Sequence, residues 1–195
     1  MTGTPRLRVI GRPEPEPTGE TNAAPQMEDA VLIRAALPRD VPEIDALVHG
    51  YAAQRILLPK ELVGYYEAVQ EFVVAQDAVT GEVVGCGALH VMWRDLAEIR
   101  TLAVNPDRKG HGIGRRLVQT LLERARELTL TRVFCLTFEV EFFKRQGFRE
   151  ITGTPVDRDV YQELLRSHDD GVAEFLDLAR VKPNTLGNSR MLIEF

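Results

Sequence analysis

A glycine-rich loop in the middle of the chain has the residue spacing that most directly suggests ligand chemistry. Gly110, Gly112 and Gly114 alternate with larger residues between an apolar, strand-like run and a helix-like pattern. Uncovered backbone N–H groups at a helix N-terminus bind phosphate, because the unpaired donors and the positive end of the helix dipole point the same way. Lys109 and Arg115 flank the loop with positive charge. We expect a phosphate-bearing ligand here, and the alternative is a flexible connector.

The loop does not match either of two common nucleotide-binding motifs. It lacks the pattern G-x-x-x-x-G-K-[ST], and the run 110–114 is not G-x-G-x-x-G. The expected phosphate ligand must therefore be recognised by a different arrangement of glycines.

The strand upstream of the loop carries a carboxylate and a cation at alternate positions. Glu98 and Arg100 share one face, because side chains two residues apart in a strand point the same way. Such a carboxylate is a candidate general base, beside a cation able to hold a substrate carboxylate. The alternative is an exposed pair at a strand end, which contributes little to stability. The residues alone favour neither interpretation.

The hydrophobic pattern around these residues predicts alternating strands and helices. Asp40 and Glu43 are expected to cap the first helix, and Leu62, Val63, Tyr66 and Val69 to form the inner face of the second. The predicted strands are 31–36, 72–75, 83–91, 97–104, 133–137, 148–151 and 191–193, and the predicted helices follow Asp40, cover 62–69, 113–124 and 141–146, and occupy most of 157–180. This order predicts an α/β fold with a mixed sheet covered on both faces.

The composition is that of an ordinary globular protein with one domain. The chain has 195 residues, of which 44% are hydrophobic and 27% charged. A net charge of −5 argues against a general nucleic-acid binder. Residues 1–28 are rich in proline and lack an apolar period, which predicts a disordered tail before a domain over 29–195. No run is long and apolar enough for a membrane span or a signal peptide, so we expect a cytoplasmic protein without membrane partners.

The cysteines and histidines do not suggest a metal site. Cys86 and Cys135 lie in apolar runs and are expected to be buried, reduced thiols. The four histidines are scattered along the chain without zinc-ligand spacing. We therefore expect no metal cofactor.

The order of elements and three motifs resemble the GNAT superfamily of acetyl-CoA-dependent N-acetyltransferases. The motifs are Val104-Asn105-Pro106, the glycine loop and the run 142–148. The family's loop pattern is Gln/Arg-x-x-Gly-x-Gly/Ala, and 109–114 matches it with Lys109 in first place, which keeps the charge. The resemblance covers about residues 30–195. It implies the GNAT fold, a mixed, mostly antiparallel twisted central sheet flanked by helices on both faces.

Further segments resemble the acetyltransferase domain of N-acetylglutamate synthases. They are 58–60, 72–74, 84–89, 97–99, 102–104 and 188–192. This resemblance implies transfer of the acetyl group from acetyl-CoA to the α-amine of L-glutamate or L-glutamine, the first step of arginine biosynthesis. Many members of that family carry an amino-acid-kinase-like domain ahead of this one, so the expectation here is the compact, single-domain bacterial type.

The resemblance also assigns roles to individual residues. It implies that Glu98 acts as a base through water. It implies binding of acetyl-CoA by Leu102, Ala103, Val104, Lys109, Gly110, His111, Gly112, Ile113, Gly114 and Arg115, with the backbone near Leu102 and Val104 running beside the pantetheine arm. It implies binding of the amino acid by Lys60, Arg100, Thr101, Ser189 and Arg190.

Two positions depart from the family pattern. Phe143 stands where many GNAT enzymes have the tyrosine that protonates the leaving thiolate, so the thiolate leaves unassisted or is helped by another group such as Tyr161 or Ser189. Gly187 stands where several relatives have an arginine two residues before the serine. A carboxylate clamp is thereby lost, which makes glutamine a serious alternative to glutamate as acceptor.

Two other functions remain open at this point. One is an N-acetyltransferase for a different amine, such as a protein N-terminus or a small molecule. The other is an acyl-CoA-binding sensor without turnover, which the missing tyrosine makes conceivable. The sequence does not determine the oligomeric state, and a homodimer is possible.

Overall fold

A computed structural model describes residues 30–54, 56–57, 60–178 and 187–195. The predicted tail over 1–28 lies outside these residues. The strands are β1 (Val31–Ala35), β2 (Phe72–Asp77), β3 (Val83–Trp93), β4 (Leu96–Val104), β5 (Arg132–Thr137), β6 (Arg149–Ile151) and β7 (Ser189–Glu194), and the helices are α1 (Val41–Ala52), α2 (Leu62–Glu67), α3 (Ile113–Glu127), α4 (Val140–Lys144), α5 (Arg158–Leu164) and α6 (Asp170–Phe175).

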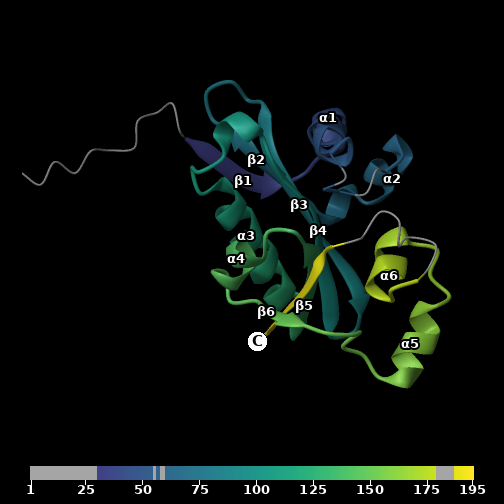
Figure 1. The fold of residues 1–195 in the computed structure, drawn as a ribbon. Helices are drawn as coiled ribbons and strands as arrows, with labels where there is room; N and C mark the ends of the chain where they lie inside the picture. Colours follow the sequence, from purple (N-terminus) through teal and green to yellow (C-terminus); the bar gives the residue numbers. More distant parts are fainter. Residues whose placement is uncertain (1–29, 55, 58–59, 179–186) are drawn as a thin grey trace, which may run out of the picture.

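The described strands form one mixed sheet in the order β1-β2-β3-β4-β5-β7-β6. Strands β4 and β5 run parallel, and the other neighbouring pairs are antiparallel. Helices α3 and α4 cover one face, while α1, α2, α5 and α6 cover the other (Figure 1). This arrangement confirms the predicted α/β fold with a mostly antiparallel sheet.

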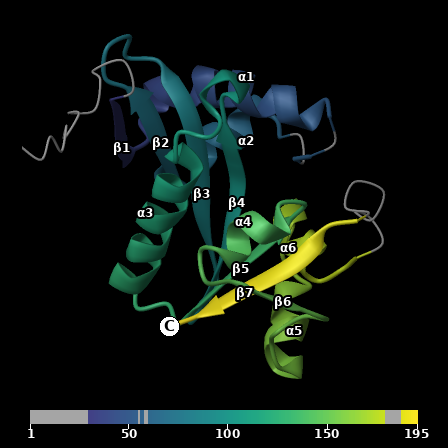
Figure 2. The same ribbon diagram turned by 60° about the vertical axis from the view of Figure 1, so that its left-hand side comes forward.

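The two halves of the sheet separate at its centre. Strands β4 and β5 pair only from Leu96 to Glu98, opposite Arg132 to Phe134. Strand β4 then continues to Val104 beside β3, and β5 continues to Thr137 beside β7. The remaining parts of β4 and β5 therefore diverge, and each leaves an edge of backbone groups facing a gap. Figure 2 shows α3 along the β1–β4 half and β7 crossing the other half.

A bulge in β4 lies beside this gap. Ala88 pairs with Arg100 and Cys86 pairs with Ala103, so two residues of β4 oppose Gly87 alone. Thr101, within the bulge, has a φ of 57°. A β-branched residue rarely adopts this left-handed conformation, and such strain persists only where the surrounding structure imposes it. The bulge redirects the end of β4 immediately after Glu98 and Arg100.

The apolar core is divided between the two faces of the sheet. The face under α3 and α4 holds one continuous cluster, which includes Leu117, Leu121 and Phe143. The opposite face holds two clusters, one beneath α1 and α2 and one beneath α5 and α6. Glu98 lies on this second face, since Ala97 and Ile99 point into the first cluster. A polar site can therefore form between the two smaller clusters.

Three details differ from the sequence expectations. No capping box forms at α1, because Asp40 accepts hydrogen bonds from Arg34 and from the N–H of Leu37, while Glu43 accepts one from Val83. The predicted inner face of α2 is wrong except at Val69, which follows the helix and packs against the core cluster beneath α1 and α2. Leu62, Val63 and Tyr66 are exposed, and Tyr65 is buried instead against Phe72.

The third difference concerns the predicted helical region over 157–180. It consists of α5 and α6 with a connection between them, and residues 179–180 lie outside the described part. Asp157 and Asp169 each begin a helix by accepting a hydrogen bond from the backbone N–H three residues later. The second cap, at Asp169, divides the region into two helices. No helix within the described ranges is long and apolar enough to cross a membrane.

Candidate active site

The glycine loop leaves its backbone uncovered at the start of α3. Gly110 and Gly112 have φ values of 86° and 75°, and Gly112 occupies the N-cap of α3 without a side-chain cap. A Cβ atom on either glycine would meet nothing within 4 Å, so the space in front of the loop is open. The backbone fits an anionic group, because uncapped N–H groups and the helix dipole are directed to the same place.

The residues around the loop tie it to the end of β4. The hydroxyl of Tyr51 donates a hydrogen bond of 2.5 Å to the carbonyl of Val104, and the Lys109 ammonium lies 5.2 Å from the centre of the Tyr51 ring. Phe142 packs near Gly114 and Val104. The loop, α4 and the end of β4 therefore border the same gap. Arg115 and His111 are exposed here, whereas the side chains of Ile113 and Ala103 are buried in the core.

Leu102 and Val104 direct their backbone polar groups into the gap. Asn105 donates its N–H to Val84 on β3, and successive residues of a strand direct their polar groups to opposite edges. The groups of Val104 and Leu102 therefore point away from β3. A ligand lying between β4 and β5 could hydrogen-bond to this edge as a further strand would.

Glu98 is a buried carboxylate at the point where β4 and β5 diverge. Its side chain is 3% exposed, and its Oε2 atom lacks a hydrogen-bond partner among the described residues. The nearest cation is Arg100, whose Nη1 lies 3.9 Å from Oε2. Burial raises the pKa of Glu98, while Arg100 and His90 act in the opposite direction. A carboxylate with a raised pKa is better matched to accepting a proton near neutral pH.

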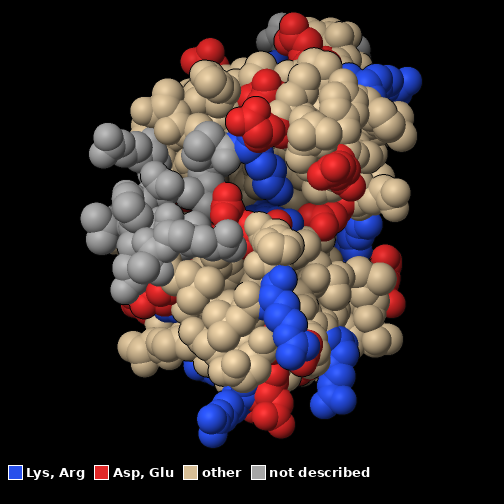
Figure 3. Space-filling view, turned by 90° about the vertical axis from the view of Figure 1, so that its right-hand side faces the viewer, with Lys and Arg blue, Asp and Glu red and all other residues tan. Residues whose placement is uncertain are grey.

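Arg100 stands at the centre of a charged cluster. Its Nη1 donates to Asp169 at 2.7 Å, and its Nη2 donates to Glu71 at 3.3 Å. The other oxygen of Glu71 lies 2.7 Å from Nδ1 of His90. We call Glu71, His90, Glu98, Arg100 and Asp169 the acceptor cluster. In Figure 3, acidic and basic side chains lie next to one another in the hollow on the face that carries α2, α5 and α6.

The charges of the acceptor cluster act on the ammonium group of Lys60. Burial lowers its pKa, and so does the nearby charge of Arg100, whereas Asp169, Glu71 and Glu98 raise it. Lys60 and Arg100, which the sequence analysis placed at the substrate, are therefore brought to the same region as Glu98. Thr101 is adjacent in the bulge.

The start of α6 is pressed against the acceptor cluster. A Cβ atom on Gly171 would lie 2.6 Å from Nη1 of Arg100 and 3.1 Å from Oε2 of Glu98. A larger residue could not occupy this position without moving these charged groups. Gly171 therefore sets how closely α6 approaches Glu98.

The predicted C-terminal site residues are held by other contacts. Ser189 donates a 2.7 Å hydrogen bond to Glu150. Arg190 donates to the carbonyls of Gly153, Glu174 and Phe175. Tyr161, one suggested proton donor, donates to the carbonyl of Leu176 at 3.4 Å.

Glu174 is a further carboxylate near Glu98. Burial, followed by the charge of Glu98, raises its pKa to about 7, and Asn188 donates a 3.0 Å hydrogen bond to it. Phe143 is buried against Phe142 and Phe148 and packs in the core beneath α3 and α4.

Sequence reasoning missed Glu71, His90, Asp169 and Gly171. Asp169 is recognisable locally as the cap of α6, but nothing nearby indicates that it also binds Arg100, which is 69 residues away in the chain. His90 pairs with Glu98 across β3 and β4. This pairing could have been inferred from the register of the hairpin if the residues that form its turn had been identified from the sequence.

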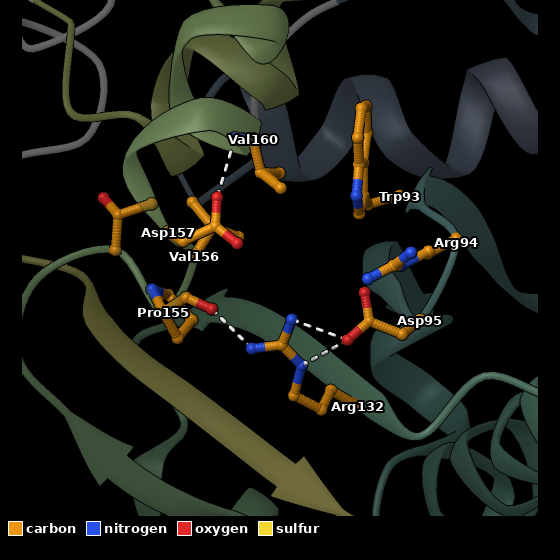
Figure 4. Close-up of a pocket in the computed structure, with 9 residues that line it drawn as sticks. Trp93, Arg94, Asp95, Arg132, Pro155, Val156, Asp157 and Val160 are labelled. Carbon is orange, nitrogen blue, oxygen red and sulfur yellow. Dashed lines mark hydrogen bonds and ion pairs between the residues drawn. The ribbon is translucent and has the colours of Figure 1, made fainter.

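A separate cavity of about 340 Å³ lies between the β3–β4 turn and α5. In Figure 4, the Arg132 guanidinium contacts Asp95 and the carbonyl of Pro155, and Trp93 stands at one side. The cavity shares no lining residue with the acceptor cluster. Across the described ranges, no group of three or more His, Cys, Asp or Glu side chains is arranged to hold a metal ion.

Comparison with known proteins identifies the class to which this fold and site belong. Residues 44–148 match the acetyltransferase (GNAT) family, and this match covers more than half of the chain. The chain therefore belongs to the GNAT family of acetyltransferases.

Individual relatives give a more specific comparison than the family match does. An amino-acid acetyltransferase of Mycobacterium tuberculosis is 61% identical over 163 residues, or 83% of this chain and 93% of the relative. The solved structure of Rv2747 from that organism, in complex with CoA and NLQ, is also 61% identical and has a TM-score of 0.82 over 84% of this chain and 99% of that one. N-acetylglutamate synthase from Neisseria gonorrhoeae, complexed with coenzyme A and N-acetyl-glutamate, shares the fold at 24% identity and a TM-score of 0.66, over 85% of this chain and 35% of that one.

Proposed function

We propose that this protein transfers the acetyl group of acetyl-CoA to the α-amine of an amino acid, with glutamine and glutamate as the acceptors to be expected. The observation that carries the proposal is the buried Glu98 at the mouth of the gap between β4 and β5, with the open glycine loop bordering the same gap. The name of the 61% identical relative, amino-acid acetyltransferase, supports it.

The glycine loop fits the pyrophosphate of coenzyme A. Gly110 and Gly112 leave room for phosphate oxygens, and the start of the 15-residue helix α3 supplies N–H groups and the positive end of a dipole. Lys109 and Arg115 flank this place with charge. The backbone edge of Leu102 and Val104, where the Val104 carbonyl already accepts from Tyr51, would then hydrogen-bond to the amides of the pantetheine arm and direct the thioester toward Glu98.

Glu98 would remove a proton from the acceptor. The α-amine of an amino acid is protonated at neutral pH, so it must lose a proton before its lone pair can attack the thioester carbon. A base whose pKa is raised by burial can accept this proton, directly or through one water. The raised pKa also suits a group that must gain and then lose a proton in each turnover near neutral pH. A backbone N–H at the bulge in β4 would stabilise the negative charge that develops on the carbonyl oxygen.

The balance of charge around Glu98 favours a neutral side chain on the acceptor. Arg100 is occupied by Asp169 and Glu71, and the guanidinium of Arg190 donates to backbone carbonyls, so Lys60 is the remaining cation near the cluster that makes no ion pair with another described residue. Lys60 can pair with one carboxylate, that of the α-carbon. A second carboxylate on the substrate would meet Glu71, Glu98 and Asp169 and be repelled. Glutamine is therefore the preferred acceptor over glutamate.

Release of free thiol from acetyl-CoA with a panel of amino acids tests the proposal. We expect glutamine or glutamate to exceed the other amino acids at least tenfold in kcat/KM, which corresponds to about 1.4 kcal/mol of discrimination. Tight binding of acetyl-CoA without thiol release from any amine would instead support a sensor.

A further inference from the structure

His90 is placed directly across the sheet from Glu98. The two residues are partners in the register of β3 and β4, so their side chains project from the same face of the sheet. His90 is 21% exposed and Glu98 is 3% exposed. His90 is therefore the more exposed of the two cross-strand partners and can exchange a proton with solvent.

Glu71 fixes the orientation of the imidazole ring. Its Oε1 lies 2.7 Å from Nδ1 of His90, and its Oε2 accepts from Arg100 at 3.3 Å. A carboxylate on Nδ1 favours the tautomer with its proton on that nitrogen, which leaves Nε2 as the proton acceptor. Glu71 thus holds both the ring and the guanidinium beside Glu98.

Most of the other described ionisable groups around Glu98 are poor proton acceptors, and Glu174, with a pKa raised to about 7, is the exception. The groups around Glu98 are Lys60 before α2, Glu71 before β2, Arg100 on β4, Cys135 on β5, Asp169 and Glu174 at the start and within α6, and Arg190 on β7. Arg100 and Arg190 already carry their protons, and burial raises the pKa of the Cys135 thiol so that it keeps its own. Lys60 is assigned to the substrate carboxylate. Despite burial, contacts with Arg100 and other donors lower the pKa of Asp169, and contacts with His90 and Arg100 lower that of Glu71. Glu174 has a raised pKa but is held by Asn188 on the side of β7.

We propose that His90, oriented by Glu71, takes the proton from Glu98 after each acetyl transfer and passes it to solvent. This inference rests on the proposed function. The acceptor ammonium loses two protons as its nitrogen becomes an amide: one ends on the thiol of coenzyme A, and the other leaves the enzyme. The second proton travels from the ammonium to Glu98, then through a bridging water to Nε2 of His90, and then to bulk water, because His90 and Glu98 make no direct hydrogen bond with each other. The carboxylate of Glu98 is thereby restored for the next substrate.

The test measures thiol release by His90→Gln, Glu71→Gln and His90→Ala at saturating substrates, together with coenzyme A affinity by calorimetry. The control is His49→Gln, because His49 is an exposed histidine on α1 outside the acceptor cluster. We expect kcat to fall about tenfold or more in His90→Gln, below the ~100-fold typical of a group that contacts the reacting atoms. Glu71→Gln should lower kcat less, and coenzyme A affinity should stay unchanged in all variants.

Chemical rescue separates proton transfer from a purely structural role. Added imidazole should raise kcat of His90→Ala in a saturable manner, with a dependence on pH that follows the neutral form of the added base. It should leave His49→Gln and the unsubstituted enzyme unchanged. Wild-type kcat in His90→Gln, or a loss of kcat that imidazole and other buffer bases do not restore, would overturn the inference.

The same experiments distinguish this inference from the proposed function. If the unsubstituted protein releases no thiol with any amino acid, the proposed function fails and the role of His90 falls with it. If the unsubstituted protein is active and Glu98→Gln is impaired, but the His90 variants behave like His49→Gln, then only the role of His90 is wrong.

Discussion

The two sides of β4 are built in different ways. The proposed coenzyme side consists mainly of backbone from one continuous stretch, the end of β4 and the loop that leads into α3. The acceptor cluster consists of side chains from β3, β4, the turn before β2 and the turn before α6, joined by contacts such as that between Arg100 and Asp169. A ligand shared by a large family can be recognised through backbone, whereas a particular acceptor requires side chains that the fold brings together.

The largest expected effect is on the acceptor side. Glu98→Gln should lower kcat by about 100-fold or more at neutral pH, because the variant keeps the shape of the side chain but cannot accept the proton. Its affinity for coenzyme A should match that of the unsubstituted protein. Thiol-release kinetics from pH 6 to 9 and calorimetry measure the two quantities. An unchanged rate over this range would remove Glu98 from the role of base.

The second prediction concerns the coenzyme side, where we expect a change in the affinity for coenzyme A. Gly112→Asp should weaken coenzyme A binding by about 10- to 100-fold, because a side chain at φ 75° is strained and its negative charge enters the place expected for phosphate. The matched control is Gly81→Asp, at φ 79° in the β2–β3 turn. The control should lose stability and keep its affinity. Equal affinities for the two variants would refute the assignment of the loop.

The third prediction concerns the approach of α6 to the acceptor cluster. Gly171→Ala would place a Cβ atom 2.6 Å from Nη1 of Arg100. We expect the displacement of the charged groups to cost more than alanine gains in helix α6, for a net loss of about 1 kcal/mol in unfolding free energy and a several-fold lower kcat. Coenzyme A affinity should be unaffected. Gly50→Ala is the control, because a Cβ atom there meets nothing within 4 Å and alanine in a helix gains up to about 1 kcal/mol. A Gly171→Ala enzyme with normal stability and rate would show that α6 is free to move away.

The smallest expected effect is on stability and depends on pH. Burial raises the pKa of Glu98 above its usual 4.5, so the folded state binds this proton more tightly than the unfolded state does. The stability contributed by this group is therefore largest below pH 4.5 and declines as the pH rises through the folded pKa. Glu98→Gln should remove that decline and be more stable than the unsubstituted protein at neutral pH. Urea unfolding at several pH values measures it, and parallel stability curves for the two proteins would contradict the prediction.

The sequence was most informative where structure follows from local pattern. The glycine spacing located the loop, and the apolar stripe of Ile113, Leu117 and Leu121 located α3 and its buried face. Period-2 geometry placed Glu98 and Arg100 on one face, as the 3.9 Å contact between them confirms. The GNAT fold is also confirmed. These features depend on neighbours within a few residues, so the chain itself specifies them.

The sequence was least informative where contacts join distant segments. The partners of Arg100 are Glu71 and Asp169, 29 and 69 residues away, and local pattern cannot predict which carboxylates meet it. The inner face of α2 was predicted wrongly because a helix of six residues gives too short a pattern to distinguish Tyr65 from Tyr66. The roles assigned to Lys60, Ser189 and Arg190 stay predictions.

The short parallel pairing of β4 with β5 leaves a gap that a bound molecule could fill, so the supply of that molecule would affect the abundance of the folded protein. A molecule that fills the gap between the strands stabilises the folded chain and has no equivalent site in the unfolded chain. At a concentration 100 times its dissociation constant, such a molecule adds about 2.7 kcal/mol to stability. With coenzyme A in that position, a fall in its supply would leave more of the protein unfolded and exposed to proteases. The opening in the sheet would then act on protein turnover as well as on acetyl transfer.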